Sequence, residues 1–297
     1  MKLTLKLANT SSDAETAAKH LGIFRFTCFG LWLLTFDFQL SAHGYSWETF
    51  ETLGVFHYLP EALSRWLLSI NLGPVSSVFL MLVFAAAAVG APMYRLWAVI
   101  AAFAALAHDS LLLGYSHIVS NIRICILLGS ILCVIAPTAE RFTWPPRKTP
   151  LQKTPSAYSL SLLMIQVTVL LTYTLAGAHR LAHNSLDLYF GDAPRSWLII
   201  RNLEQIGGLE GIGITIAQTP ALLMGYQLGL LAITMIEAMS LLCLNSKRFT
   251  LMWLIAMSVF HLLSHFTMHI FFWQNMVLIW VLFWPFKRGF KRQEVEV

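Results

Sequence analysis

Long apolar runs dominate the chain, and shorter polar segments separate them. A helix needs about 20 mostly apolar residues to cross the roughly 30 Å hydrocarbon core of a bilayer. Eight runs approach that length, and the last two form one apolar stretch that we divide into a hairpin. The pattern predicts transmembrane helices over residues 21–39, 74–90, 93–113, 117–136, 158–178, 219–243, 249–268 and 270–286.

Two segments between the predicted spans are too long to be turns, and both are amphipathic. Residues 40–73 carry Trp47 and Trp66, and residues 179–218 carry Trp197. Tryptophan is enriched where a helix lies in the membrane–water interface. The predicted fold class is therefore all-α: a polytopic membrane bundle of about eight transmembrane helices with two interfacial amphipathic segments.

Composition points to the same class. The 297 residues are 57% hydrophobic and 12% charged, which is too little polar surface to cover a soluble globule. We therefore interpret the net charge of +5 as a signal of how the chain is oriented in the bilayer, and not as a nucleic-acid-binding surface. The bilayer is the first expected partner, and nucleic acid is not expected.

The basic residues indicate an orientation. With a cytoplasmic N-terminus, fourteen of the twenty Lys and Arg residues fall in cytoplasmic segments or at their borders. Because cytoplasmic loops are enriched in these residues, both termini are predicted to be cytoplasmic. We divide the chain into a cytoplasmic segment 1–20, a transmembrane domain 21–286 and a basic cytoplasmic tail 287–297, and we expect it in the cell membrane.

This orientation gathers polar residues toward the outer face. Asp37, Asp109, Asn121 and Arg123 lie at the outer ends of predicted spans, and a charge inside a span costs about 3 kcal/mol unless it faces the bundle, a partner or water. The sequence predicts a polar pocket that opens outward. Nine of the ten histidines fall at this level: His43, His57, His108, His117, His179, His183, His261, His265 and His269.

The fifth span carries a polar stripe. Gln166, Tyr173, Gly177 and Arg180 are separated by seven, four and three residues, which places them near one line on a helix. One interpretation is that the stripe bonds neighbouring helices, with Arg180 extending to the lipid headgroups. The other is that the stripe forms one wall of the pocket, where Arg180 holds an anionic or oxygen-rich ligand.

The seventh span carries His261 and His265, four residues apart, with His269 four further along. Such spacing suits a proton relay, a metal or a haem. No carboxylate lies beside them in sequence, although metal ligands usually have such partners, so we favour hydrogen bonding or proton handling. The cysteines also lack metal-ligand spacing, and no metal or disulfide is predicted.

Glu237 is an isolated carboxylate in the predicted inner half of the sixth span. A carboxylate at membrane depth is a functional-site hypothesis. Pairing with a neighbouring helix, near Arg25, is the alternative.

Several short motifs occur in an order that is similar to the HTTM family, the transmembrane domain shared with vitamin K-dependent gamma-carboxylase. They are FRFTCFGLWLL in the first span, the series from Gln166 through Tyr173 to Ala176-Gly177, the intramembrane Glu237, the basic loop SKRFT, and VFHLL with His261. The resemblance covers essentially the whole chain and implies a membrane bundle of the same type, without the large extramembrane domain of the carboxylase.

The resemblance also implies candidate catalytic residues. In the carboxylase, lysines follow the Ala-Gly motif, and one is regarded as the base that deprotonates vitamin K hydroquinone. Here the corresponding pair is His179 and Arg180. Arginine stays protonated at ordinary pH and cannot be the base, whereas histidine can. His117 is a positional candidate for the Asn-His motif of the family.

Three hypotheses follow. The first is an enzyme that acts on a quinone-like molecule or lipid, with His179 as base, Arg180 stabilising a developing anion, and His261 and His265 handling protons. The second is a non-catalytic partner or assembly protein in a membrane complex, and the third a transporter of a small solute or protons. For the first, the expected substrate-binding residues are Tyr173, Gln166, Arg123, His117, His108 and Glu237.

Overall fold

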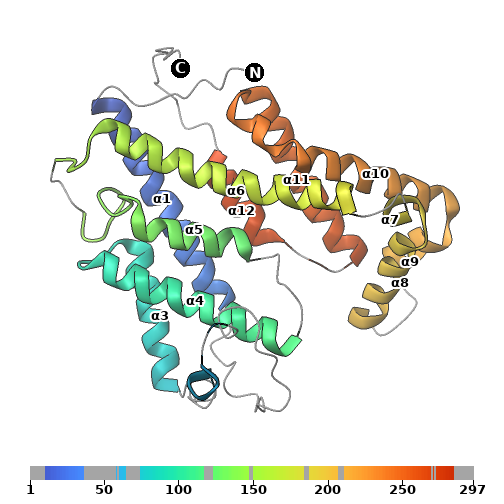
Figure 1. Ribbon diagram of the computed structural model, residues 1–297, viewed down its shortest axis with the longest axis horizontal. Helices are drawn as coiled ribbons and strands as arrows, with labels where there is room; N and C mark the ends of the chain where they lie inside the picture. The colour runs from blue at the N-terminus through green and yellow to red at the C-terminus, as the bar shows by residue number, and fades with distance from the viewer. Residues whose placement is uncertain are drawn as a thin grey trace. The chain divides into compact units, whose positions relative to one another are not determined.

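The computed structural model describes residues 11–36, 58, 60–64, 74–116, 123–146, 150–183, 187–206, 211–268, 270 and 272–283. Every regular element within these ranges is helical, which confirms the all-α prediction (Figure 1). The chain divides into two compact units, which we call the N-terminal unit, up to Ile165, and the C-terminal unit, from Gln166 onward. Residues 1–10, residues 284–297 and most of residues 40–73 lie outside the described residues.

The N-terminal unit contains α1 (Ser11–Thr35), α3 (Pro74–Val89), α4 (Tyr94–Ser116), α5 (Ile124–Ile135) and the first part of α6 (Pro155–His183). Figure 1 shows α1, α3, α4 and α5 packed together, and fully buried side chains such as Phe24 and Trp32 line α1 within the unit.

The C-terminal unit contains the rest of α6, then α7 (Asp187–Phe190), α8 (Ala193–Ile206), α9 (Ile212–Gln218) and α10 (Pro220–Ala238). The 3-10 helix η4 (Ser240–Leu244), α11 (Lys247–Met268) and α12 (Trp273–Phe283) complete it. Helix α11 ends at Met268 and α12 begins at Trp273, so the last apolar stretch is divided into two helices close to the predicted position.

Among the described residues, α6, α10 and α11 are long and apolar enough to cross a membrane, and shorter apolar helices cover Ser77–Val89, Ile124–Ile135 and Trp273–Phe283. The structure is thus compatible with a membrane protein. Several helices have bounds that differ from the predicted spans: α1 begins at Ser11, within the segment predicted to be cytoplasmic, and α6 extends to His183. The run over residues 219–243 does not stay α-helical, because α10 ends at Ala238. Ser240 Oγ donates to the Glu237 carbonyl at 2.7 Å, and a serine that bonds nearby backbone competes with helix continuation.

Arg25 joins three segments of the N-terminal unit. Its side chain is fully buried, and its guanidinium donates to three carbonyl oxygens: Nε to Ala88 at 3.1 Å, Nη1 to Thr138 at 2.6 Å, and Nη2 to Phe142. Gly90 has a φ of +65°, and a Cβ there would lie 2.6 Å from Nη1. Glycine is therefore required both by the backbone conformation and by the space that the arginine occupies.

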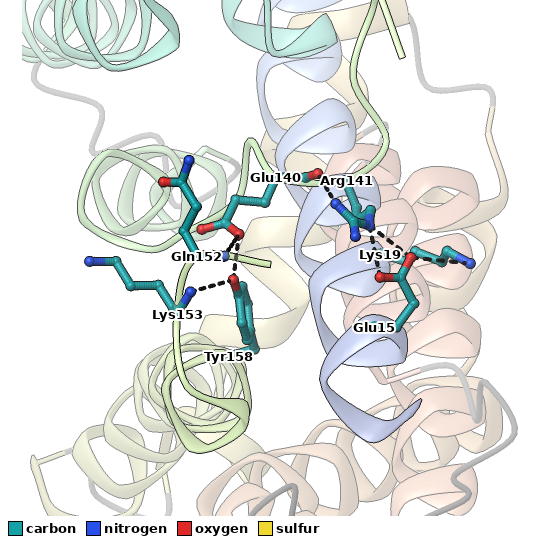
Figure 2. A network of polar contacts seen from close by, with 7 residues as sticks. All are labelled: Glu15, Lys19, Glu140, Arg141, Gln152, Lys153 and Tyr158. Carbon is teal, nitrogen blue, oxygen red and sulfur yellow. Dashed lines mark hydrogen bonds and ion pairs between the residues drawn. The ribbon is translucent and has the colours of Figure 1, made fainter. Parts of the chain in front are cut away.

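The segment after α5 is also tied to α1 by an ion pair. Arg141 Nε lies 2.8 Å from both carboxylate oxygens of Glu15, and Lys19 approaches the same carboxylate at 3.5 Å (Figure 2). This contact closes a separation of 126 residues in the chain. The predicted cytoplasmic connector is consequently fixed to the N-terminal part of α1.

A second carboxylate fixes the same connector to α6. Glu140 Oε2 accepts from the main-chain N–H of Gln152 at 2.8 Å and from the Tyr158 hydroxyl. The main-chain N–H of Lys153 donates to that hydroxyl at 3.1 Å (Figure 2). Since Glu140 and Arg141 are adjacent, the side chains of one short segment bond to α1, which precedes it in the chain, and to α6, which follows it.

Acidification should weaken the Glu15 contact. Hydrogen bonding from Arg141 lowers the pKa of Glu15, so the ionised form is favoured by folding. Its stabilisation is complete above the ordinary glutamate pKa of about 4.3 and is lost as the pH falls through the lowered value. Because the carboxylate is partly exposed, we expect Glu15→Gln to reduce stability at neutral pH by about 1 kcal/mol or less.

Unfolding of the detergent-solubilised protein, followed by intrinsic fluorescence at neutral and acidic pH, measures this difference. The difference in stability between Glu15→Gln and the wild-type protein should shrink as the pH falls below about 4. Lys19→Gln is the matched control, because Lys19 is mostly exposed and should change little. A Glu15→Gln effect of the same size at both pH values would contradict the prediction.

Candidate functional site

The polar stripe of α6 lies on one buried face, as predicted. Gln166, Tyr173 and Gly177 are buried, and Arg180 is partly buried at the end of the stripe. Gln166 Nε2 donates to the Leu282 carbonyl at 3.1 Å, which joins α6 to α12. The stripe therefore does bond a neighbouring helix through Gln166. The alternative, that it also borders a ligand, depends on what surrounds Tyr173.

Arg180 pairs with Glu237 where α6 meets α10. Arg180 Nη1 lies 2.5 Å from Glu237 Oε2, and the Glu237 side chain is only 3% exposed. Gly177, one turn earlier, allows this approach, because a Cβ there would lie 2.8 Å from the Thr234 carbonyl oxygen. The glycine brings the two helices close enough for the arginine to reach the carboxylate.

This ion pair corrects two predictions. Glu237 pairs with Arg180 and not near Arg25, whose guanidinium is bonded to carbonyl oxygens. Arg180 and Glu237 were also expected in opposite halves of the membrane, which is wrong because a 2.5 Å pair requires a common depth. The physical reason is that a buried carboxylate needs a cation, and Gly177 makes Arg180 the cation within reach.

His261 is the most unusual polar residue of the C-terminal unit. Its side chain is 3% exposed, and neither ring nitrogen has a hydrogen-bond partner among the described residues. Buried polar atoms in proteins are nearly always bonded, and the exceptions are often sites for a ligand, an ion or chemistry. This imidazole is therefore the strongest candidate for a ligand contact within the described part of the chain.

Aromatic rings surround His261. The Phe272 ring lies 4.9 Å from it and the Tyr173 ring 6.5 Å, while Tyr173 meets Trp253 edge-on at 5.2 Å. We call these four residues, Tyr173, Trp253, His261 and Phe272, the His261 cluster. It joins α6, α11 and the residue preceding α12. Its rings are apolar and its polar atoms few, as in the lining of many small-molecule sites.

Trp253 is held in place by a bond of its own. Its indole Nε1 donates to Ser240 Oγ at 2.7 Å, and its ring packs edge-on against Phe283 at 5.7 Å. Sequence analysis overlooked Trp253, although helical spacing was a usable signal: residues 253, 257 and 261 recur every four positions on one face of α11. Phe272 carried no comparable signal, because it lies outside both helices of the hairpin.

The other histidines of these helices are placed differently. His179 is exposed and its ring stacks on His183, with centroids 4.4 Å apart. His265 is half-buried, with its ring 5.5 Å from Phe266, although it is only one turn from His261. Of the predicted proton-handling residues, His261 alone is buried beside Tyr173. The catalytic roles assigned to His179 and His265 stay predictions.

A separate polar cluster lies in the N-terminal unit. Arg123 Nη1 contacts His108 Nδ1 at 3.2 Å and Asp109 Oδ1 at 3.5 Å. His108 is 3% exposed, and the Phe36 ring lies 4.3 Å from it, while Arg123 sits over the Trp32 ring at 5.9 Å. His108, Asp109 and Arg123 thus lie together in the N-terminal unit. Their expected partners lie outside the described residues: Asp37, His117 and Asn121.

The described residues include no group of three or more His, Cys, Asp or Glu side chains placed to hold a metal ion. Comparison with known proteins adds no family assignment: no protein-family model, curated protein or solved structure matches the chain.

Removing one partner of the Arg180–Glu237 ion pair should lower the free energy of unfolding more than removing both partners. Arg180→Gln leaves the buried Glu237 carboxylate without its cation, and we expect a loss of about 3–5 kcal/mol in the free energy of unfolding. Combining it with Glu237→Gln removes the unpaired charge, so the double variant should be more stable than Arg180→Gln alone.

Chemical denaturation of the detergent-solubilised variants measures these differences. Arg195→Gln is the matched control, since Arg195 is exposed on α8. Equal stability of Arg180→Gln and the wild-type protein would rule out a stabilising ion pair.

Proposed function

We propose that this protein is a multi-pass membrane protein of the HTTM type, and that its His261 cluster binds and transforms a quinone-like molecule or lipid. The observation that carries the proposal is the buried imidazole of His261, whose two ring nitrogens have no partner among the described residues. The motif VFHLL, which contains His261, is also one of the elements of the HTTM resemblance.

The proposed chemistry is proton transfer at a ligand oxygen. Neutral imidazole has one nitrogen that accepts a proton and one that donates, so His261 can take a proton from a bound hydroxyl or return one. Trp253, Tyr173 and Phe272 would hold a flat ring beside it by stacking and edge contacts. His179 and His265 are proposed to exchange protons between this cluster and its surroundings.

The proposed role of Arg180 follows from its partner. Glu237 neutralises its charge, so the pair presents no net charge to a ligand. Arginine has five N–H donors, and those not bonded to the carboxylate could stabilise a developing anion. We propose that the pair first positions α6 against α10, and with it Tyr173 of the same face.

A non-catalytic partner in a membrane complex is the second candidate. The observation in its favour is that Gln166 and Arg180 both bond neighbouring helices, as polar residues do when they only join spans. The two candidates differ in one consequence: only the first requires a small molecule at His261.

For topology we propose that the end of α6 and the end of α10 lie at one depth, which eight alternating full-length spans would not allow. Single cysteines introduced into a variant without native cysteines, labelled with a membrane-impermeant maleimide, test it. We expect Ser196→Cys to react from outside and Lys153→Cys only after permeabilisation. Asn245→Cys discriminates further: labelling from outside is expected if Glu237 lies at the depth of Arg180, whereas labelling only after permeabilisation would support the eight-span order.

Ligand retention tests the proposed site. Extraction and mass spectrometry of lipids and quinones from purified protein should show one lipophilic molecule enriched over the bulk membrane lipids. His261→Ala should reduce its occupancy at least about tenfold, which corresponds to about 1.4 kcal/mol of binding free energy. His183→Ala is the matched control, because His183 is exposed.

Stability must be measured on the same preparations, with His261→Gln as a second variant that keeps a polar side chain. Loss of the molecule from folded His261 variants supports the proposal. Absence of any enriched molecule from the wild-type protein, together with altered stability of the variants, would favour the non-catalytic candidate.

A further inference from the structure

Helix α8 presents two different apolar faces. Pro194, Leu198 and Asn202, which recur every four residues, are buried against the C-terminal unit. On the remaining surface Trp197 is 43% exposed, Ile200 50% and Leu203 43%. The unit therefore covers one face of α8 and leaves a second apolar face uncovered within the described structure.

The position of α8 relates it to the end of a candidate span. Asn202 Nδ2 donates to the Thr267 carbonyl at 2.8 Å, and Thr267 belongs to the last turn of α11. The end of a membrane-crossing helix lies near the interface between hydrocarbon and water. The 14 residues of α8 extend about 21 Å, too short to cross the roughly 30 Å core, so α8 can lie at this level but not span it.

Two arginines border the buried face. At 100° per residue, Arg195 and Arg201 fall on opposite sides of the line through Pro194, Leu198 and Asn202. Arg195 is exposed and Arg201 half-buried. The helix sequence holds these two arginines and one acid, Glu204, which leaves a net positive charge.

We propose that α8 is a binding surface for anionic phospholipids. Trp197, Ile200 and Leu203 insert among the lipids, while Arg195 and Arg201 extend along the helix to bind headgroup phosphates. Arginine suits this role because its long side chain reaches the headgroups and its planar guanidinium bonds phosphate through two N–H groups. This inference rests on the proposed membrane embedding of the chain.

Lipid fits this surface better than a protein partner because of where the surface lies. It adjoins the end of an apolar span, and its aromatic and aliphatic residues are combined with basic ones, as in helices that rest on membranes. A positive helix is complementary to a negatively charged headgroup layer, and each arginine near such a layer contributes about fivefold to binding.

The full chain is reconstituted into vesicles of phosphatidylcholine alone and into vesicles that also contain phosphatidylglycerol. Amide hydrogen exchange of residues 193–206 is then followed by mass spectrometry. We expect exchange to slow in the anionic vesicles, and Arg195→Gln and Arg201→Gln each to remove about fivefold of that protection. Arg248→Gln, at the opposite end of α11, is the matched control and should keep the protection.

Two further measurements on the wild-type protein need no variant. Raising the salt to about 1 M shortens the screening length to about 3 Å and should weaken the protection in anionic vesicles. Adding inorganic phosphate to phosphatidylcholine vesicles should not reproduce it, because free phosphate supplies no bilayer.

Equal exchange of residues 193–206 in both kinds of vesicle would overturn the lipid-binding proposal. So would protection that is insensitive to salt and to both arginine variants, which would indicate burial against protein. Failure of the protein to float with vesicles of either composition would instead overturn the proposed membrane embedding, so the two failures are distinguishable.

Discussion

The cost of burying a charge governs how both units are assembled. Arg25 is fully buried, and the N-terminal unit surrounds its guanidinium with carbonyl oxygens from the end of α3 and from the segment after α5. Glu237 is nearly fully buried, and the C-terminal unit brings Arg180 to it. In each case an unsatisfied buried charge would cost several kcal/mol of folding free energy. Helix arrangements that give the charge its partners are therefore strongly favoured in the folded state.

Glycine makes both arrangements possible. Gly90 lets the backbone pass the Arg25 guanidinium in a left-handed conformation, and Gly177 lets α6 approach α10 closely enough for Arg180 to reach Glu237. Small residues at helix contacts are common in membrane proteins because apolar side chains gain little by packing on each other instead of lipid. The polar contacts then supply the specificity that the hydrophobic surfaces lack.

Against this background His261 stands out among the described residues, because the surrounding rings leave both its nitrogens without partners. The pairing of Arg180 also changes the electrostatics expected at the site. A free arginine would attract an anion, whereas the Arg180–Glu237 pair carries no net charge. Residues expected in one outward pocket belong to two polar clusters, each within its own unit: His108 with Asp109 and Arg123, and the His261 cluster.

Local pattern alone determined the all-α class, the division of the last apolar stretch after Met268 and the shared face of Gln166, Tyr173 and Gly177, because helical periodicity and apolar run length are properties of neighbouring residues. Only the tertiary structure decided the partners of Arg25 and Glu237, the end of α10 at Ala238 and the isolation of His261. Arg180 and Glu237 are 57 residues apart in the chain. Which cation reaches a buried carboxylate depends on helix packing in three dimensions, and no local periodicity encodes that choice.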